Sequence, residues 1–168
     1  GIVGGSGSGK TTLGMAVLGI VPSAMRVVSG QIIFEGKNIL DLSREEMRRV
    51  RGSRIGMVFQ EPMSAFDPVF TVGAQIRETI LAHRVISKSS LEKKILALLE
   101  AAGVPDPRRV AQSYSHELSG GLRQRAMIAQ AISCEPALLI ADEPTSSLDV
   151  TLQAHIMELL RRIRKDLG

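Results

Sequence analysis

The sequence feature that most constrains this chain is a glycine-rich run near its beginning, Gly4-Gly5-Ser6-Gly7-Ser8-Gly9-Lys10-Thr11. The run fits the pattern G-x-x-x-x-G-K-[S/T], in which glycines let the backbone turn tightly and point N–H groups around a chain of phosphates. Lys10 is then placed to reach the β- and γ-phosphates, and the Thr11 hydroxyl is placed to hold Mg²⁺. The apolar pair Ile2-Val3 is typical of a strand end, and Thr12 to Ile20 are typical of a helix. Strand, loop and helix in this order predict a nucleotide-phosphate site rather than a flexible glycine-serine linker.

The composition is that of a globular protein without disulfides. The chain has 168 residues, of which 44% are hydrophobic and only 3% aromatic, so we expect one domain with an aliphatic core. Cys134 is the single cysteine, which excludes an internal disulfide and fits a reducing compartment. A buried thiol is favoured over a nucleophile at that position. No apolar run approaches the ~20 residues that a membrane-spanning helix needs.

The net charge of +4 comes largely from two arginine-rich runs, at residues 44–54 and 161–165. A basic surface can bind nucleic acid, but neither run contains the aromatic side chains on which bases stack. We therefore favour solvated helix faces. Proximity to an anionic membrane leaflet stays open as a second reason for the charge.

An antiparallel β segment is predicted after the first helix. Gln31 to Phe34 form a short strand, and Glu35-Gly36-Lys37 form the turn after it. Ser43 with Glu46 predicts a capping box for a short arginine-rich helix that ends near Gly52.

Two further strands are predicted to end in polar residues. Arg54 to Phe59 are followed by Gln60, whose amide can coordinate Mg²⁺ or orient a water, although this signal is weak alone. Ala137 to Ala141 are nearly all apolar, as in a buried parallel strand, and run into Asp142-Glu143. Asp142 is expected as a second Mg²⁺ ligand and Glu143 as a general base toward water.

The segment between these strands is predicted to be a helical subdomain. Residues 71–102 have helical periodicity, with Thr71 as one N-cap and Ser89 with Glu92 as a second capping box. Such a block interrupts an α/β pattern, so it should fold as a separate layer.

Two further segments each precede a predicted helix: one contains serine and glycine, and the other ends in an aspartate. Leu118-Ser119-Gly120-Gly121-Leu122 leads into a helix over Arg123 to Ile132, and it is either a second anion site or a loop with a serine N-cap. Asp149 is expected to cap the last helix, over Val150 to Asp166.

Taken together, these residues resemble the nucleotide-binding domain of ABC transporters. Gly4 to Thr11 match the Walker A motif, Gln60 the Q-loop, and Leu118 to Leu122 the LSGGQ signature. Leu138 to Glu143 match Walker B with its catalytic glutamate, and Ser147-Leu148-Asp149 match the D-loop. Their joint order and spacing are highly specific for this family.

One position departs from the family pattern. Leu122 stands where the signature usually has glutamine. The runs Gln60 to Ser64 and Leu118 to Arg125 are most similar to the ATPase subunits of peptide and nickel importers, in which a hydrophobic residue commonly occupies that place. The substitution therefore does not count against an ATPase.

The resemblance implies a fold, an activity and a set of residues. The fold is an α/β P-loop NTPase with a mostly parallel central sheet, an antiparallel β subdomain near the N-terminus and a helical subdomain at about 71–133 carrying the signature. It implies ATP and Mg²⁺ as cofactors, Glu143 and Gln60 as catalytic residues, and Thr11, Gln60 and Asp142 as metal ligands. The expected nucleotide contacts are Gly4, Gly5, Ser6, Gly7, Ser8, Gly9, Lys10, Thr11, Thr12, Ser119, Gly120, Gly121 and Asp149.

The resemblance also implies partners. Two such domains pair head to tail as a homo- or heterodimer, so that Ser119 and Gly121 of one face the ATP held by the other. Transmembrane permease subunits and an extracytoplasmic substrate-binding protein complete an importer at the cytoplasmic face of the inner membrane, and no nucleic acid is expected. The family's adenine-stacking aromatic and switch histidine would precede Gly1 and follow Gly168, so we expect residues 1–168 to be one domain truncated at both ends.

Two alternatives remain. The first is a soluble ABC-type ATPase acting on nucleic acid or ribosomes; DNA-repair members carry long coiled-coil arms, for which the sequence before Ser119 shows no heptads. The second is a nucleotide-binding module without hydrolysis, against which the presence of Glu143 argues.

Overall fold

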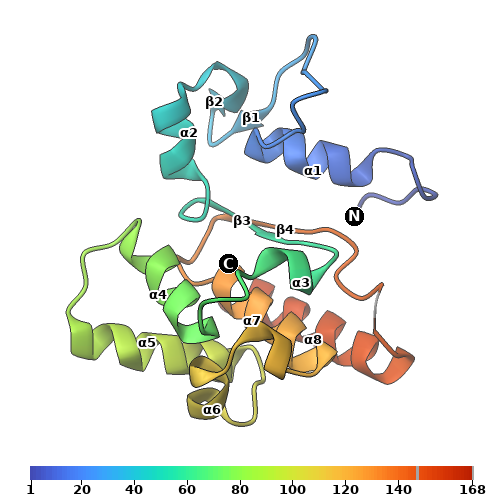
Figure 1. The fold of residues 1–168 in the computed structure, drawn as a ribbon. Helices are drawn as coiled ribbons and strands as arrows, with labels where there is room; N and C mark the ends of the chain where they lie inside the picture. The colour runs from blue at the N-terminus through green and yellow to red at the C-terminus, as the bar shows by residue number, and fades with distance from the viewer. Residues whose placement is uncertain (147, 168) are drawn as a thin grey trace. The chain divides into compact units, whose positions relative to one another are not determined.

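The computed structural model describes residues 1–146 and 148–167 (Figure 1). The chain divides into two compact units, residues 1–51 and the residues from Gly52 onward. The expectation of one domain over the whole chain, truncated at both ends, stays a prediction.

The first unit combines a helix, a small hairpin and a second helix. Its elements are, in order, α1 (Lys10–Leu18), β1 (Ile33–Phe34), β2 (Lys37–Asn38), the 3-10 helix η1 (Ile39–Asp41) and α2 (Arg44–Val50). β1 and β2 are antiparallel, and the turn between them uses positive φ at Glu35 and Gly36. The predicted antiparallel segment is therefore confirmed as a two-stranded hairpin.

Side chains fix the start of α2 and join the residue after it, Arg51, to α1. The predicted capping box is present: Glu46 accepts from the Ser43 N–H at 2.8 Å, and Ser43 accepts from the Glu46 N–H at 3.3 Å. Hydrogen bonds from the Ser43 side chain and backbone hold the pKa of Glu46 below its usual value. Just after the helix, Arg51 donates to the carbonyls of Leu18 at 2.6 Å and Gly19 at 2.8 Å. Arg51 therefore satisfies carbonyls at the C-terminus of α1, which the interpretation of solvated helix faces missed.

The predicted strand at Ile2-Val3 is wrong for the described structure. Both residues are irregular and exposed, because no backbone ladder pairs with them. A strand forms only where a neighbouring segment satisfies its backbone groups, and no described segment pairs with these two residues. The helix after the phosphate loop is confirmed, but it begins at Lys10 and ends before Gly19.

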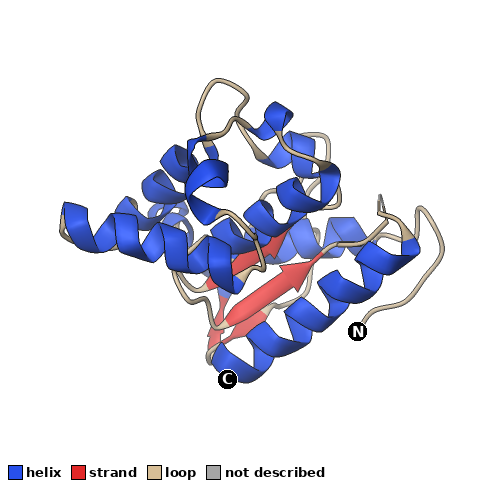
Figure 2. Ribbon diagram, turned by 90° about the horizontal axis from the view of Figure 1, so that it is seen from below, coloured by secondary structure: helices blue, strands red, loops and turns tan. Residues whose placement is uncertain are grey.

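The second unit pairs two parallel strands with a group of helices. Its elements are, in order, β3 (Ile55–Val58), α3 (Pro62–Ala65), α4 (Val72–Leu81), α5 (Lys88–Ala101), α6 (Pro107–Gln112), the 3-10 helix η2 (Ser115–Glu117), α7 (Gly120–Ala131), β4 (Leu138–Ala141) and α8 (Val150–Leu167). Figure 2 shows β3 and β4 side by side, with α8 running back along one face of the pair. The helices between the strands supply the crossover that a parallel pair requires.

The register of the strands determines which residues lie beside each other where the strands end. Ile55 lies opposite Leu138 and Val58 opposite Ala141, and the ladder continues with the Asp142 N–H donating to the Val58 carbonyl at 2.9 Å. β3 is buried throughout, whereas β4 is only half-buried. The prediction of a buried strand at residues 137–141 is therefore wrong in its burial. Each strand has one paired neighbour among the described residues, but β3 also packs against α7.

The helical layer is confirmed as the main core of this unit. Ile76 and Ile80 of α4, Ile95 and Leu99 of α5, and Ile128 of α7 are all at most 1% exposed. Each such side chain contributes about 1.5–3 kcal/mol on burial. The thiol of Cys134 lies at the edge of this core and is buried, as expected.

One predicted cap is wrong. The start of α5 is capped by Ser87, which accepts from the Ser90 N–H at 3.4 Å, rather than by Ser89. The carboxylate of Glu92, expected in the capping box, instead pairs with Arg77 of α4. An ion pair between helices has thus replaced a local contact that the sequence allowed equally well.

Candidate functional site

The phosphate loop, residues 4–11, is folded around its own lysine. The Lys10 ammonium donates to the carbonyls of Gly4 at 2.9 Å and Gly5 at 3.0 Å, while the Ser8 N–H donates to the Gly5 carbonyl at 3.3 Å. The positive charge is therefore held across the loop rather than extended into solvent. A phosphate chain entering the loop would meet this charge at its centre.

The glycines of the loop leave room and donors for an anion. Gly7 and Gly9 have φ values of 75° and 89°, which side-chain-bearing residues rarely adopt. Gly9 is the N-cap of α1 and has no side chain with which to accept from the first N–H groups, those of Lys10, Thr11 and Thr12. The positive end of the helix dipole lies at this start, and its contact with a nucleotide phosphate stays a prediction.

The second unit brings Gln60 and Glu143 together. Each lies two residues beyond the Val58–Ala141 pair, so the parallel register places them side by side at the carboxyl end of the two strands. The Gln60 amide donates to the Glu143 carboxylate at 3.2 Å. Two residues that are 83 positions apart, and were both predicted as catalytic, are therefore in contact.

Asp142 and Glu143 differ in exposure and backbone conformation. Asp142 is only 7% exposed, and its backbone is fixed by the strand ladder. Glu143 leaves the ladder with φ of 42°, a left-handed conformation that costs about 1–3 kcal/mol outside glycine. Ser146 stabilises this turn, because its N–H and its hydroxyl both donate to the Glu143 carbonyl at 3.1 Å. A strained acid beside a buried one is the arrangement expected of a reactive centre.

The predicted ligands are chemically suited to Mg²⁺. The Thr11 hydroxyl, the Gln60 amide and the Asp142 carboxylate all offer the hard oxygen atoms that this ion prefers. Among residues 1–146 and 148–167, no group of three or more His, Cys, Asp and Glu residues gathers around a common point. The roles of Thr11, Gln60 and Asp142 as metal ligands stay predictions.

The start of α7 keeps both of its interpretations open. Ser119 is the N-cap, and its hydroxyl accepts from the Leu122 N–H at 3.4 Å. The helix begins at Gly120, three residues earlier than the sequence predicted. An ideal Cβ on Gly121 would lie 2.6 Å from Leu152 of α8, so this glycine permits close packing of two helices. The nucleotide contacts expected of Ser119, Gly120 and Gly121 stay predictions.

The D-loop is described in part. Asp149 accepts from the Leu152 N–H at 2.9 Å, which confirms it as the cap of α8, whereas Ser147 lies outside the described residues. The expected contact of Asp149 with nucleotide stays a prediction.

Sequence reasoning missed two buried or half-buried glutamines that hold the segment after Glu143. Gln124 of α7 donates to the Pro144 carbonyl at 2.8 Å, and Gln153 of α8 donates to the carbonyls of Thr145 at 3.1 Å and Leu148 at 3.0 Å. A glutamine in a helix carries no local signal for such a contact.

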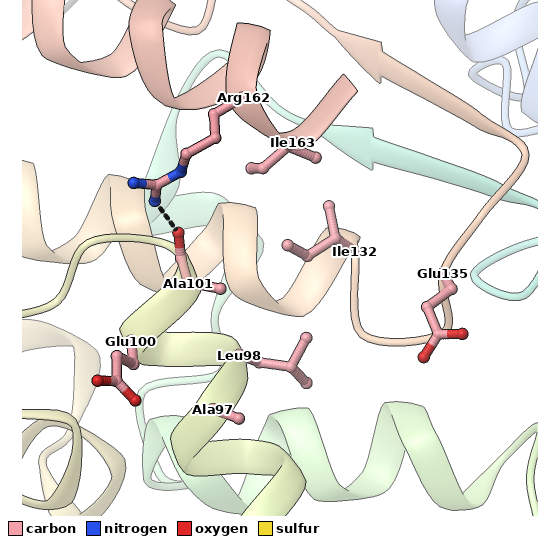
Figure 3. Close-up of a pocket in the computed structure, with 8 residues that line it drawn as sticks. All are labelled: Ala97, Leu98, Glu100, Ala101, Ile132, Glu135, Arg162 and Ile163. Carbon is pink, nitrogen blue, oxygen red and sulfur yellow. Dashed lines mark hydrogen bonds between the residues drawn. The ribbon is translucent and has the colours of Figure 1, made fainter. Parts of the chain in front are cut away.

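A separate cavity of about 610 Å³ lies between α5, the end of α7 and α8 (Figure 3). Leu98, Ile132 and Ile163 form its apolar part. Arg162 at its rim donates to the Ala101 carbonyl at 2.6 Å, and Glu135 is paired with Lys94 and Arg84, chiefly Lys94, which keeps the pKa of Glu135 below its usual value. Two of its charged side chains, those of Arg162 and Glu135, are thus already engaged, and none of the predicted site residues lines the cavity.

Comparison with known proteins identifies the class. A family model described as ABC transporter matches residues 1–146, and the chain belongs to that family. The structure is similar to a dimeric ATP-binding cassette bound to ADP and Pi, with a TM-score of 0.80 and 30% identity over 98% of this chain and 68% of that one. It is also similar to cbiO1 of Clostridium perfringens, part of an ABC transporter complex, with a TM-score of 0.81 and 32% identity over 99% of this chain and 62% of that one. The predicted P-loop NTPase fold is confirmed.

The curated relatives that the chain resembles are named as ATP-binding proteins of peptide and dipeptide transport. The chain is 47% identical to a probable peptide ABC transporter ATP-binding protein of Sinorhizobium fredii, over 100% of this chain and 50% of the relative. It is 46% identical to the dipeptide transport ATP-binding protein DppD of Bacillus subtilis, over 98% of this chain and 49% of the relative. The chain therefore spans about half the length of the curated relatives it matches, and the resemblance to peptide-importer subunits is confirmed.

Proposed function

We propose that this chain binds and hydrolyses ATP as part of an ABC importer of peptides or nickel. The observation that carries the proposal is the contact between Gln60 and Glu143 at the ends of two paired parallel strands. This contact supports the roles of Glu143 as base and Gln60 as a water-orienting amide, and the sequence of the other unit contains the whole phosphate-loop pattern. The names of the relatives, which concern peptide and dipeptide transport, support the substrate class.

Each residue has a distinct role in this mechanism. The N–H groups at the start of α1 and the Lys10 ammonium bind the phosphates, and Mg²⁺, when bound, would neutralise charge on them. Thr11, Gln60 and Asp142 are the residues that would hold that ion. Glu143 accepts a proton from the attacking water, whose orientation Gln60 fixes through its amide.

The proposal includes a head-to-tail dimer. In it, the start of α7 in one copy would face the phosphates held by the other, so Ser119 and Gly121 would complete the site. A related cassette was solved as a dimer with ADP and Pi, which supports this arrangement. We infer permease subunits and an extracytoplasmic substrate-binding protein as further partners, with the dimer at the cytoplasmic face of the membrane. No helix among the described residues is long and apolar enough to cross a bilayer.

Nucleic acid is not favoured as a partner. Several arginines that contribute to the positive charge donate to backbone carbonyls: Arg51 at the end of α1, Arg123 before α7, and Arg125 and Arg162 at the end of α5. Their guanidinium groups are therefore partly committed to the fold.

The test replaces Glu143 with glutamine in the full-length gene product. Glu143→Gln keeps the size of the side chain but removes the base, so turnover of Mg-ATP should fall by about 10²–10⁴-fold while binding is retained. An ATP-bound dimer should then accumulate, as gel filtration with light scattering would detect. Wild-type turnover by Glu143→Gln would show that the base is elsewhere.

A further inference from the structure

Gln124 is a polar side chain buried in a mostly apolar helical core. It lies on α7 and is only 1% exposed, although glutamine is among the side chains that usually stay in water. Burying an amide is unfavourable unless it is hydrogen-bonded. Its Nε2 donates to the Pro144 carbonyl at 2.8 Å, a well-formed contact with the residue that directly follows Glu143.

The residues directly before and after Glu143 are thus both held by hydrogen bonds to other segments. Before it, the Asp142 N–H is held in the ladder by the Val58 carbonyl. After it, the Pro144 carbonyl is held by Gln124. Between these two anchors Glu143 keeps φ of 42°, a conformation that persists only where the surroundings enforce it.

The same helix carries Ser119 at its N-terminus. Gln124 lies four positions after Gly120, so the helix connects the signature and the Pro144 contact within about one turn. Gly121, in the first turn of α7, lies close to the Leu152 side chain of α8. A displacement of the signature would therefore be transmitted directly to the residue beside Glu143.

We propose that Gln124 is a positioning residue, which sets the Glu143 carboxylate against Gln60 and couples it to the signature at the start of α7. The inference rests on the proposed function, because it assigns Glu143 the role of base. Gln124 does not touch the substrate. Its effect is on the placement of Glu143, and an error of about 1 Å at a reacting group can cost on the order of 10²-fold in rate.

The main variant is Gln124→Met in the full-length gene product, which keeps the volume and removes both N–H donors. Turnover should fall about ten- to a hundredfold with an unchanged KM for ATP, since the phosphate loop is untouched. The matched control is Gln130→Met. Gln130 lies on the same helix and donates to the Thr79 hydroxyl of α4 at 3.1 Å, away from Glu143. Gln130→Met should keep wild-type turnover to within about twofold.

A second measurement needs no turnover. The Ser146 N–H donates to the Glu143 carbonyl and the Leu148 N–H to the Thr145 carbonyl, so hydrogen exchange at these two amides reports on the segment. Exchange there should be about tenfold faster in Gln124→Met than in Gln130→Met, with equal exchange in α5.

Should Gln124→Met fail to fold, the wild-type protein still decides the question. One side-chain amide proton of Gln124, followed by NMR with labelled glutamine, should exchange at least about tenfold more slowly than that of an exposed glutamine. An unprotected Gln124 amide would overturn the inference.

The outcomes separate the inference from the proposed function. If wild type hydrolyses ATP, Glu143→Gln does not, and Gln124→Met matches Gln130→Met in turnover and exchange, Gln124 is not a positioning residue and the proposed function stands. If wild type does not hydrolyse ATP, the proposed function fails, and the exchange comparison alone decides whether Gln124 fixes the segment.

Discussion

The helix starts of α1 and α7 look alike in the sequence, yet their first N–H groups are satisfied differently. α1 begins after Gly9, whose φ is 89° and which has no side chain to act as a cap. α7 begins after Ser119, with φ of −62°, and its hydroxyl accepts from the Leu122 N–H. The first start therefore has no side-chain cap, whereas the second has one.

The glycines at the two helix starts also have different structural roles. An ideal Cβ on Gly5, Gly7 or Gly9 would meet nothing within 4 Å, so these glycines supply backbone conformation and open space around the loop. A Cβ on Gly121 would collide with Leu152, so that glycine supplies close helix packing. Glycine and serine at a helix start therefore do not by themselves identify an anion site. The cap and the packing neighbours of the glycines must also be known.

The largest expected difference between the two starts is in nucleotide binding. Lys10→Ala removes the charge held across the phosphate loop and should weaken Mg-ATP binding by the full-length gene product about a hundredfold, or ~2.7 kcal/mol. Calorimetry measures the affinity directly. Lys37→Ala is the control, because it removes an exposed lysine of the same unit and should leave affinity unchanged. Equal affinities for Lys10→Ala and wild type would show that the phosphate loop does not bind ATP through Lys10.

Much of the site could be predicted from local pattern. The phosphate loop has a fixed spacing, and Gln60, Asp142 and Glu143 each come after an apolar strand. Because parallel strands end at the same edge of a sheet, two correct strands were enough to bring these polar residues together. The contact between Gln60 and Glu143 confirms that reasoning.

Other features depend on tertiary contacts that no local pattern encodes. Ser87 and Ser89 are equally plausible caps for α5, and the choice depends on Glu92 pairing with Arg77 on another helix. The contact of Gln124 with Pro144 spans 20 residues and joins α7 to the segment after β4, so it exists only in the folded unit. Local chemistry was therefore predictable, and the contacts that fix its geometry were not.

Alanine substitutions at the two helix starts should change the free energy of unfolding in opposite directions. Gly9→Ala places a Cβ at φ of 89° and should lower the free energy of unfolding by about 1–2 kcal/mol. Gly120 is the first residue of α7, and a Cβ added there would meet nothing within 4 Å. Gly120→Ala should therefore raise the free energy of unfolding by about 0.5 kcal/mol. Denaturant unfolding of the full-length gene product measures both. Changes of the same sign and size would mean that the two helix starts have equivalent backbones.

The smallest expected effect concerns the cap of α7. Ser119→Ala removes the hydroxyl that accepts from the Leu122 N–H and should cost about 1 kcal/mol in the free energy of unfolding, whereas Ser119→Gly should cost only a few tenths. ATP turnover separates capping from phosphate contact. If the hydroxyl serves only as a cap, turnover recovers in Ser119→Gly together with stability. If it also contacts the nucleotide of a partner copy, turnover stays low in both variants. An unchanged unfolding free energy in Ser119→Ala would show that the 3.4 Å contact contributes no cap, and that the two helix starts are alike after all.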